Sequence, residues 1–446
     1  MTRETYATGT PRERFVLCGV LFPEQVVEQE GELSEAHGLV FAAGGEVVGD
    51  RITQRRARPT AATLMGKGKV EEVLDEVRAY KPDGVVVDND LTPAQGRNLE
   101  EAWGVRVVDR SELILDIFAR RARTGQARLQ VELAQTEYLL PRLKRMWTHL
   151  ERMEGAIGAR GPGETQLETD RRLIRKRIAD LKARLREIEK RKLREVRSRH
   201  EEFTIGLVGY TNAGKSTLLN RLTGAEEFAA DLLFATLDTR TRKWRLSDGR
   251  TVLLSDTVGF LSRLPHHLVA SFHATLEETL HADLLLHIAD ASHPDAVEQI
   301  RAVDDVLGEL SQGGRDTVLV FNKIDDVDDP IELTWLRSER QEDSLFLSAK
   351  TGEGVEDLDR LVRQRLDLRS ARVHVLVPLA DGRTIARVRE AGVILGETVC
   401  DEESALSMEL KIDDVALGNL RHGLPKEVQL EVVEPAVEPR EPAGLD

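Results

Sequence analysis

The first part of the chain alternates between short apolar runs and segments with helical spacing. Apolar, β-branched runs predict strands at Phe15–Leu21, Glu46–Arg51, Asp83–Val87 and Val105–Val108. Apolar residues three or four apart predict helices at Ser34–Ala43, Val70–Val77, Thr92–Trp103 and Ser111–Arg121. Ser111 is the expected cap of the last helix. Strands that alternate with helices indicate a small parallel α/β unit, which we expect to occupy residues 14–124.

The pattern changes to long helices over residues 125–200. Apolar residues recur at helical spacing from Val131 to Met146, with a kink expected at Pro141. A glycine-rich stretch follows, and a second helix is predicted from about Thr165 to Arg199. Its apolar residues alternate steps of four and three, as in a coiled-coil seam, at Ile174, Ile178, Leu181, Leu185 and Ile188. Two long helices joined by one loop predict an antiparallel hairpin with the glycines at its tip.

Two further units follow. Residues 201–367 carry apolar runs that each end in a polar motif, which predicts a doubly wound sheet. Residues 372–434 read as a βαββαβ order, which predicts a ferredoxin-like α+β domain. Its expected elements are strands at Val373–Leu379, Val393–Cys400, Ala405–Ile412 and Glu427–Val433, with helices at Gly382–Glu390 and Asp413–Arg421. The remaining residues, 435–446, are rich in Glu, Pro and Ala, and we expect them to be disordered.

Composition and charge narrow the class of protein. The chain has 446 residues, two cysteines in no metal or redox spacing, no signal sequence and no apolar run long enough to span a bilayer. These features predict a cytoplasmic protein. The net charge is −15, yet residues 119–199 alone carry a balance of +12, so the rest of the chain carries −27. A basic segment in an acidic protein suits either a polyanionic partner or a solvated helix face, and charge alone leaves the two open.

The strongest chemical signal is a glycine loop between an apolar run and a helix start. The pattern Gly-x-x-x-x-Gly-Lys-Ser has the spacing of a phosphate-binding loop, whose backbone N–H groups surround a polyphosphate. Lys215 is predicted to reach the β and γ phosphates, and the Ser216 hydroxyl to bind Mg²⁺. The nucleotide contacts expected here are Gly209, Tyr210, Thr211, Asn212, Ala213, Gly214, Lys215, Ser216 and Thr217.

Three further motifs stand at strand ends in the expected order. The first predicts an Asp256 that holds Mg²⁺ through water and a Gly259 whose N–H meets the γ-phosphate, and it comprises Asp256, Thr257, Val258 and Gly259. The second predicts that the Asp325 carboxylate recognises guanine, with the stem of Lys323 over the purine, and comprises Asn322, Lys323, Ile324 and Asp325. The third offers backbone N–H groups to guanine O6 and comprises Ser348, Ala349 and Lys350. Together these motifs predict a Ras-like P-loop GTPase domain that binds GTP and GDP.

Two features bear on the rate of hydrolysis. A mobile segment is predicted at residues 234–239, and Thr236 and Thr239 within it compete with the nearby Thr241 as the Mg²⁺ ligand. The residue after Gly259 is Phe260, which cannot orient the attacking water as Gln does in many GTPases, so intrinsic hydrolysis should be slow. Asn212 is either a ligand for an activating K⁺ or a local turn residue, and spacing leaves both open.

The segment before this domain carries a resemblance to a known family. The string from Gly161 to Arg172 looks like the signature of the HflX family, as do Leu129–Gln135 and Gly66–Lys69. The resemblance covers Phe15 to Leu366 and, more loosely, extends to Val433. It favours Phe234, Ala235 and Thr236 within the first switch segment, and so selects Thr236 as the Mg²⁺ ligand. With Lys215 and Gly259, Thr236 completes the predicted catalytic set.

The resemblance implies a GTPase that binds the 50S ribosomal subunit and the 70S ribosome and splits stalled or idle ribosomes. The hairpin would then be a probe that contacts rRNA, because basic side chains bind its backbone and small tip residues enter its cavities. The rRNA-contacting candidates are Gly155, Ile157, Gly158, Arg160, Gly161, Gly163, Arg171 and Arg172. Ala156 departs from the family, which usually has a second glycine there, and Thr239 replaces a frequent Pro.

Other functions remain compatible with the sequence. A GTPase that assists assembly of the large subunit would need the same motifs. Some family members bind or hydrolyse ATP through the N-terminal region, so an RNA-binding ATPase is a further alternative. The segment Gly66–Lys69 lacks the Lys-Ser/Thr ending of a phosphate loop and is predicted to be a turn that opens a helix. We expect a monomer, and peripheral membrane association is left open.

Overall fold

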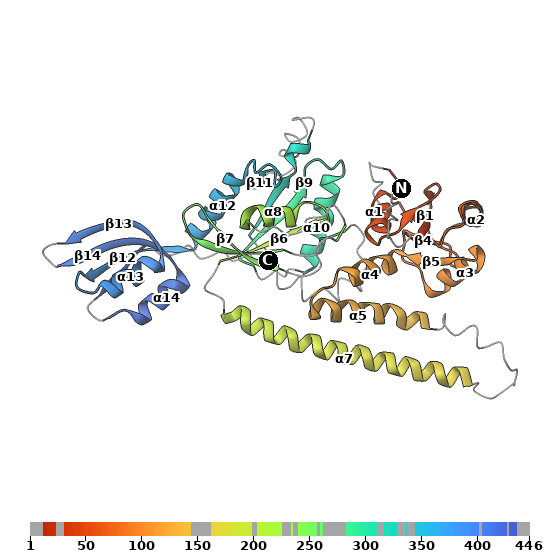
Figure 1. Ribbon diagram of the computed structural model, residues 1–446, viewed down its shortest axis with the longest axis horizontal. Helices are drawn as coiled ribbons and strands as arrows, with labels where there is room; N and C mark the ends of the chain where they lie inside the picture. The colour runs from red at the N-terminus through yellow and green to blue at the C-terminus, as the bar shows by residue number, and fades with distance from the viewer. Residues whose placement is uncertain are drawn as a thin grey trace, which may run out of the picture.

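The computed structural model describes residues 12–23, 31–143, 162–198, 203–224, 233–234, 240–256, 259–261, 282–310, 316–327, 336, 344–400, 404–425 and 428–434. Three sheets follow one another along the chain, and a long helix runs beside the first unit (Figure 1). This arrangement confirms the predicted multidomain α/β class. Among the described helices, none is long and apolar enough to cross a membrane.

The N-terminal sheet is parallel and centres on β1 (Arg14–Leu21). On one side of β1 lie β4 (Gly84–Val87) and then β5 (Arg106–Asp109). On the other side the predicted strand Glu46–Arg51 is wrong, because two short strands, β2 (Glu46–Val47) and β3 (Ile52–Arg55), pair with successive parts of β1. Gly49 separates them with a φ of +74°, a backbone conformation that ends a strand.

Four of the described helices cover this sheet: α1 (Ser34–Ala42), α2 (Lys67–Tyr80), α3 (Pro93–Trp103) and α4 (Arg110–Arg121). Side-chain caps at Thr92 and Asp109 explain where α3 and α4 begin. Gly66 is the N-cap of α2, as a helix-opening turn requires. The prediction that Ser111 caps α4 is wrong. The cap is Asp109, whose carboxylate accepts from the N–H of Glu112, whereas the Ser111 hydroxyl donates to Asp90 at 2.5 Å.

The basic rod consists of α5 (Gly125–Leu139) and the antiparallel α7 (Pro162–Ser198), as Figure 1 shows. Leu181 and Leu185 of the predicted seam are buried and pack against Leu133 of α5. The opposite face of α5, with Val131 and Ala134, packs on α4 instead. α5 is therefore a middle layer between the N-terminal unit and α7. At Pro141 the chain passes into a short 3₁₀ helix, η1 (Leu140–Arg142), where the kink was expected.

The base of the rod is anchored to the N-terminal sheet by a buried polar cluster. The Tyr138 hydroxyl and the Arg142 guanidinium each donate to the Asp109 carboxylate at 2.9 Å. The Arg142 guanidinium also lies 3.7 Å from the centre of the Tyr138 ring. Burial raises the pKa of Asp109, and burial beside Asp109 and Glu112 raises the pKa of the Tyr138 hydroxyl. The cluster thus joins the strand end at β5 to the end of α5.

The central sheet has the order β11-β10-β9-β6-β8-β7 and is parallel except for β7. Its strands are β6 (Thr204–Gly209), β7 (Arg240–Arg245), β8 (Thr251–Asp256), β9 (Leu284–Asp290), β10 (Thr317–Asn322) and β11 (Ser344–Phe346). The helices that flank it are α8 (Lys215–Thr223), α10 (Ala296–Leu310) and α12 (Val355–Leu368), with the 3₁₀ helix η2 at Ile324–Asp326. Parallel strands bring the polar residues at their carboxyl ends to one edge.

The C-terminal sheet is antiparallel, with the order β13-β14-β12-β15. Its elements run β12 (Ser370–Pro378), α13 (Gly382–Ala391), β13 (Val393–Cys400), β14 (Ala405–Asp413), α14 (Asp414–Gly423) and β15 (Gln429–Glu434). This is the predicted βαββαβ order. Lys411 of β14 pairs with Asp367 at 2.8 Å, so an ion pair joins this domain to the end of α12.

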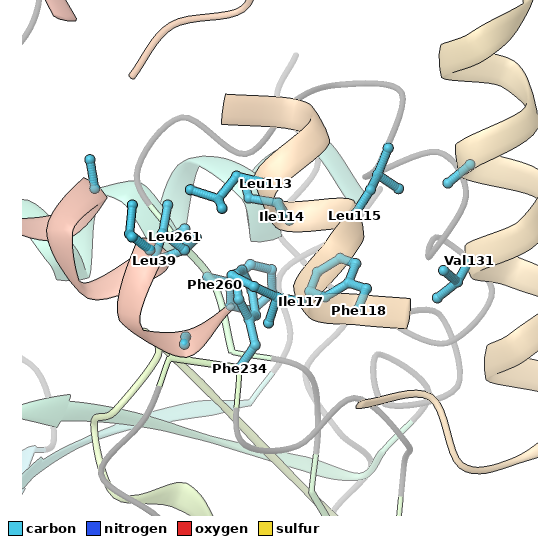
Figure 2. Close-up of a cluster of buried hydrophobic side chains, with 14 of the residues drawn as sticks. Leu39, Leu113, Ile114, Leu115, Ile117, Phe118, Val131, Phe234, Phe260 and Leu261 are labelled. Atoms are coloured by element: carbon cyan, nitrogen blue, oxygen red, sulfur yellow. The ribbon is translucent and has the colours of Figure 1, made fainter. Parts of the chain in front are cut away.

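The N-terminal and central units share one hydrophobic core. Phe118 of α4 and Leu39 of α1 lie in the same cluster as Phe234, Phe260 and other residues of the central unit (Figure 2). The rings of Phe118 and Phe234 meet edge to face, with centroids 4.6 Å apart. Phe234 is 1% exposed and Phe260 2%. Phe234 lies in the predicted mobile segment and Phe260 directly follows the Asp256–Gly259 motif, so the N-terminal unit packs against both of these regions.

Candidate functional site

The glycine loop lies between β6 and α8, at the carboxyl edge of the central sheet. Gly209 has a φ of +149°, and a Cβ there would lie 2.1 Å from the carbonyl oxygen of Ile288. Gly214 has a φ of +93°, and a Cβ there would lie 2.1 Å from the Asn322 amide nitrogen. Both positions therefore require glycine, and the loop can wrap closely around a ligand. Asn212 also adopts the left-handed conformation, with a φ of +65°.

Lys215 begins α8 and is 6% exposed. Its ammonium group donates to the carbonyl oxygens of Gly209 at 2.9 Å and Tyr210 at 2.7 Å. Burial lowers the pKa of Lys215 to about 8, against the opposing effect of the Asp256 carboxylate. The loop carbonyls therefore hold a partly desolvated cation inside the turn, which is the position from which a lysine can reach bound phosphate.

The residues present fit a magnesium ion. The Ser216 hydroxyl donates to the Asp256 carboxylate at 2.7 Å, and Asp256 is only 1% exposed at the end of β8. A hydroxyl and a carboxylate beside a phosphate loop are the hard oxygen donors that Mg²⁺ prefers. When bound, the ion would neutralise phosphate charge. Thr217 follows in the first turn of α8.

The backbone after Asp256 returns to the phosphate loop. The Thr211 N–H donates to the Phe260 carbonyl at 2.7 Å, and the Phe260 N–H donates to the Gly209 carbonyl at 3.1 Å. A Cβ at Gly259 would lie 2.8 Å from Thr211 Cα and 3.1 Å from the Lys215 ammonium nitrogen. Gly259 thus stands beside the lysine, where an N–H could meet a terminal phosphate. The Phe260 ring points away into the interdomain core.

The base-recognition motif is tied to the phosphate loop by Asn322. Its amide donates to the Ala213 carbonyl at 2.8 Å and its carbonyl oxygen accepts from the Ala349 N–H at 2.9 Å. Asn322 is 2% exposed, so it acts as a buried link between the two loops. The Asp325 carboxylate follows in η2, and a hydrogen bond from Ser348 is the main cause of its lowered pKa. Lys350 pairs with Asp325 at 3.3 Å.

Sequence patterns alone did not identify one residue of this edge, Asp290. It lies at the end of β9, 7% exposed, and accepts from Lys323 at 2.6 Å and from the Ser292 hydroxyl at 2.7 Å. Lys323 itself has a φ of +63°. The carboxylate therefore orients the lysine whose stem is expected to cover the purine. An Asp at the end of a buried apolar strand was the signal that could have identified it.

The predicted switch segment is only partly described. Ala235, Thr236 and Thr239 lie outside the described residues, as do Thr257 and Val258. The Phe234 side chain lies in the interdomain core, in the same cluster as Tyr210 of the phosphate loop. Thr241 lies in β7, and its hydroxyl is 3.1 Å from that of Ser255 on the paired strand β8.

The structure describes only some of the rRNA-contacting candidates. Gly155, Ile157, Gly158, Arg160 and Gly161 lie outside the described residues. Gly163 falls in the first turn of α7, and Arg171 and Arg172 follow on the same helix, Arg172 being exposed. Many exposed basic side chains continue along α7: Arg175, Lys176, Arg177, Lys182, Arg184, Arg186, Lys190 and Arg191. The N-terminal ATP site and the monomeric state stay predictions.

A phosphate loop, a hydroxyl–carboxylate pair for Mg²⁺ and an Asn-Lys-x-Asp base motif at one sheet edge define a P-loop GTPase. Models of three protein families match the chain in order. Residues 30–119 match "GTP-binding GTPase N-terminal", residues 121–199 match "GTP-binding GTPase Middle Region", and residues 204–323 match "50S ribosome-binding GTPase".

Two relatives are similar to this chain in sequence over most of its length. GTPase HflX of Escherichia coli (strain K12) is 44% identical over 402 residues, which cover 90% of this chain and 93% of that protein. GTPase HflX of Caldanaerobacter subterraneus is 42% identical over 403 residues, which cover 90% and 91%. A solved GTP-binding protein from Sulfolobus solfataricus in complex with GDP shows 22% identity and a TM-score of 0.42, covering 79% of this chain and 98% of that chain. The chain belongs to the HflX family of GTPases, and it hydrolyses GTP to GDP and phosphate.

Proposed function

We propose that this GTPase binds the large ribosomal subunit in the cytoplasm and, in its GTP form, separates the subunits of stalled or idle ribosomes. The observation that carries the proposal is the basic rod. α7 is a long helix whose outward side chains are dominated by Arg and Lys, within a protein whose net charge is −15. Such a surface favours a polyanion, and rRNA is the polyanion of the ribosome.

The match of residues 204–323 to a family described as 50S ribosome-binding GTPases supports the choice of the large subunit. Buried leucines hold α7 against α5, and α5 packs on α4. α7 is thus held in a fixed position relative to the N-terminal unit, which supports a role as a probe. Its far end begins at Pro162, after the glycine-rich stretch that would enter an rRNA cavity.

The nucleotide site would control this contact. Lys215 would hold the β and γ phosphates, while Ser216 and Asp256 would hold Mg²⁺, the latter through water. In the GTP form, Thr236 and Gly259 would order around the γ-phosphate and present the switches to the ribosome. Asp325 would select guanine. Because Phe260 is buried in the interdomain core, hydrolysis would depend on the ribosome for stimulation, with Asn212 and K⁺ as a further source of charge.

Binding to isolated 50S subunits tests the role of the rod. Arg184→Glu with Lys190→Glu changes two exposed residues of α7 by a total charge of −4. Arg78→Glu with Lys81→Glu makes the same change on exposed residues at the end of α2 and serves as the control. We expect only the rod variant to weaken binding. The slope of log K against log salt concentration should also become less steep, by about one for each phosphate that the rod no longer neutralises. Equal effects of the two variants would reject the rod as the binding surface.

Splitting requires a separate experiment. GTP-bound protein is mixed with 70S ribosomes, and light scattering follows the disappearance of intact particles. Deletion of residues 155–163 should abolish splitting and leave GTP affinity intact. If the deletion variant still splits ribosomes, the tip is not the probe. If the full-length chain binds 50S subunits and leaves 70S particles whole, an assembly function replaces the splitting function.

A further inference from the structure

The side chain of the phosphate-loop residue Tyr210 packs against the N-terminal unit. Tyr210, which directly follows Gly209, is 6% exposed and belongs to the core shared with the N-terminal unit. Its hydroxyl donates a hydrogen bond to the carboxylate of Glu35, in the first turn of α1. The two residues are 175 positions apart in the chain, so this is a direct polar contact between the N-terminal unit and the phosphate loop.

The Glu35 carboxylate is also bound by Arg110, which forms a buried ion pair with Asp88. Arg110, at the start of α4, donates to the other oxygen of the Glu35 carboxylate and to Asp88 at 2.5 Å. The side chains of Arg110 and Asp88 are each 2% exposed. Burial lowers the pKa of Arg110, but Asp88 and Glu35 raise it by more, so the guanidinium stays charged. Asp88 follows β4, and its N–H donates to the Cys18 carbonyl at 2.8 Å. Glu35 is therefore fixed to the N-terminal sheet.

The main chain of Tyr210 contacts Lys215, the lysine of the phosphate-loop motif. The Tyr210 carbonyl accepts from the Lys215 ammonium group at 2.7 Å. One residue thus connects Lys215 through its main chain and Glu35 through its side chain. A shift of Tyr210 would move one of the two carbonyl oxygens that hold the Lys215 ammonium group.

We propose that Glu35 is a positioning residue of the nucleotide site, contributed by the N-terminal unit and acting through Tyr210. Arg110 and Asp88 hold Glu35, Glu35 holds the Tyr210 hydroxyl, and Tyr210 holds the phosphate loop in the form that keeps nucleotide bound. The rate of GDP release would then depend on the contact between Glu35 of α1 and Tyr210 of the phosphate loop. This inference rests on the GTPase site alone and does not depend on the ribosome.

The packing around the contact supports a fixed geometry. Phe234 and Phe260 seal the shared core with Phe118 and Leu39, as Figure 2 shows. A Cβ at Gly38 of α1 would lie 3.1 Å from the Leu233 side chain, so α1 meets the central unit closely one turn beyond Glu35. Because the helix cannot slide without breaking this packing, the carboxylate is presented at a defined point.

The test measures dissociation of a fluorescent GDP analogue from the full chain. Tyr210→Phe removes the hydroxyl alone, and Glu35→Gln removes the charge of the acceptor. Each should accelerate dissociation by about three- to tenfold, because a hydrogen bond to a charged group is removed or weakened. The double variant should be no faster than the stronger single variant, since both act through one contact. Glu32→Gln is the matched control: its carboxylate bonds to Thr53 and Arg55 within the N-terminal unit, and dissociation should not change.

Thermal unfolding separates positioning from simple stability. If Tyr210→Phe and Glu35→Gln lower the melting temperature and leave dissociation unchanged, Glu35 is only a structural residue and the proposal fails. Additive effects on dissociation would also overturn it, because they would show two independent contacts. Should Glu35→Gln fail to fold, Tyr210→Phe still decides the question, since it removes a single oxygen atom at the same contact.

Discussion

The buried lysine of the phosphate loop makes nucleotide affinity depend on pH. In the free protein, burial lowers the pKa of Lys215 to about 8. Bound phosphates would surround the same group with negative charge, which raises its pKa. The neutral lysine of the free protein would therefore take up a proton when GDP binds above pH 8. Because binding is coupled to this protonation, affinity is full well below pH 8 and falls as pH rises through it.

A pKa of about 8 for Lys215 in the free protein sets the size of the effect. At pH 7 about nine-tenths of the free protein would carry a charged Lys215, and at pH 8.5 only about a quarter. Affinity for GDP should then fall about fourfold between these values, and binding at pH 8.5 should take up about three-quarters of a proton. The terminal phosphate of GDP is already ionised in this range, and guanine still keeps its N1 proton.

Isothermal titration calorimetry in two buffers of different ionisation enthalpy measures the proton uptake directly. The control is Lys215→Arg, because a guanidinium stays charged throughout this range and its uptake should vanish. A flat affinity with no proton uptake in the original chain would refute the reasoning. It would mean that the carbonyls of Gly209 and Tyr210, with Asp256, keep the lysine fully charged despite its burial.

Three other substitutions test separate parts of the structure. Asp325→Asn should shift preference from guanosine to xanthosine nucleotides, measured by competition, because the amide can donate to the xanthine oxygen; unchanged GTP preference would remove Asp325 from base recognition. Phe234→Ala opens a cavity in the interdomain core and should cost about 3–5 kcal/mol in denaturant unfolding, whereas a cost below about 1 kcal/mol would place the ring outside the core. Leu181→Ala should cost about 2–5 kcal/mol of local stability and raise hydrogen exchange in α5, which unchanged exchange would contradict.

The phosphate loop and the helix seam could be predicted from the sequence because each depends on residues that are close together in the chain. A glycine that must adopt positive φ, such as Gly214, and a lysine one residue later are set by neighbouring positions. The helix seam around Leu181 was likewise visible as spacing. The prediction was wrong where two neighbouring residues could both cap a helix. Asp109 is the N-cap of α4, and the hydroxyl of Ser111, the predicted cap, donates to Asp90.

The two faces of α5 show where sequence reasoning stops. Its apolar residues were visible as one helical pattern, yet Leu133 faces α7 while Val131 and Ala134 face α4. Periodicity shows that a face is buried and does not name the partner. The same limit hid Asp290, whose role appears only when β9 and β10 lie side by side and bring Lys323 within 2.6 Å.

The sequence by itself determined the order of the units, the phosphate loop and the base motif, since each depends on residues a few positions apart. Only the tertiary structure decided that Phe234 and Phe260 belong to a core shared with α1 and α4, and that Tyr210 reaches Glu35. Contacts between residues 175 positions apart depend on how whole units dock. Docking is decided by the complementary shape and burial of many side chains at once, which no local pattern encodes.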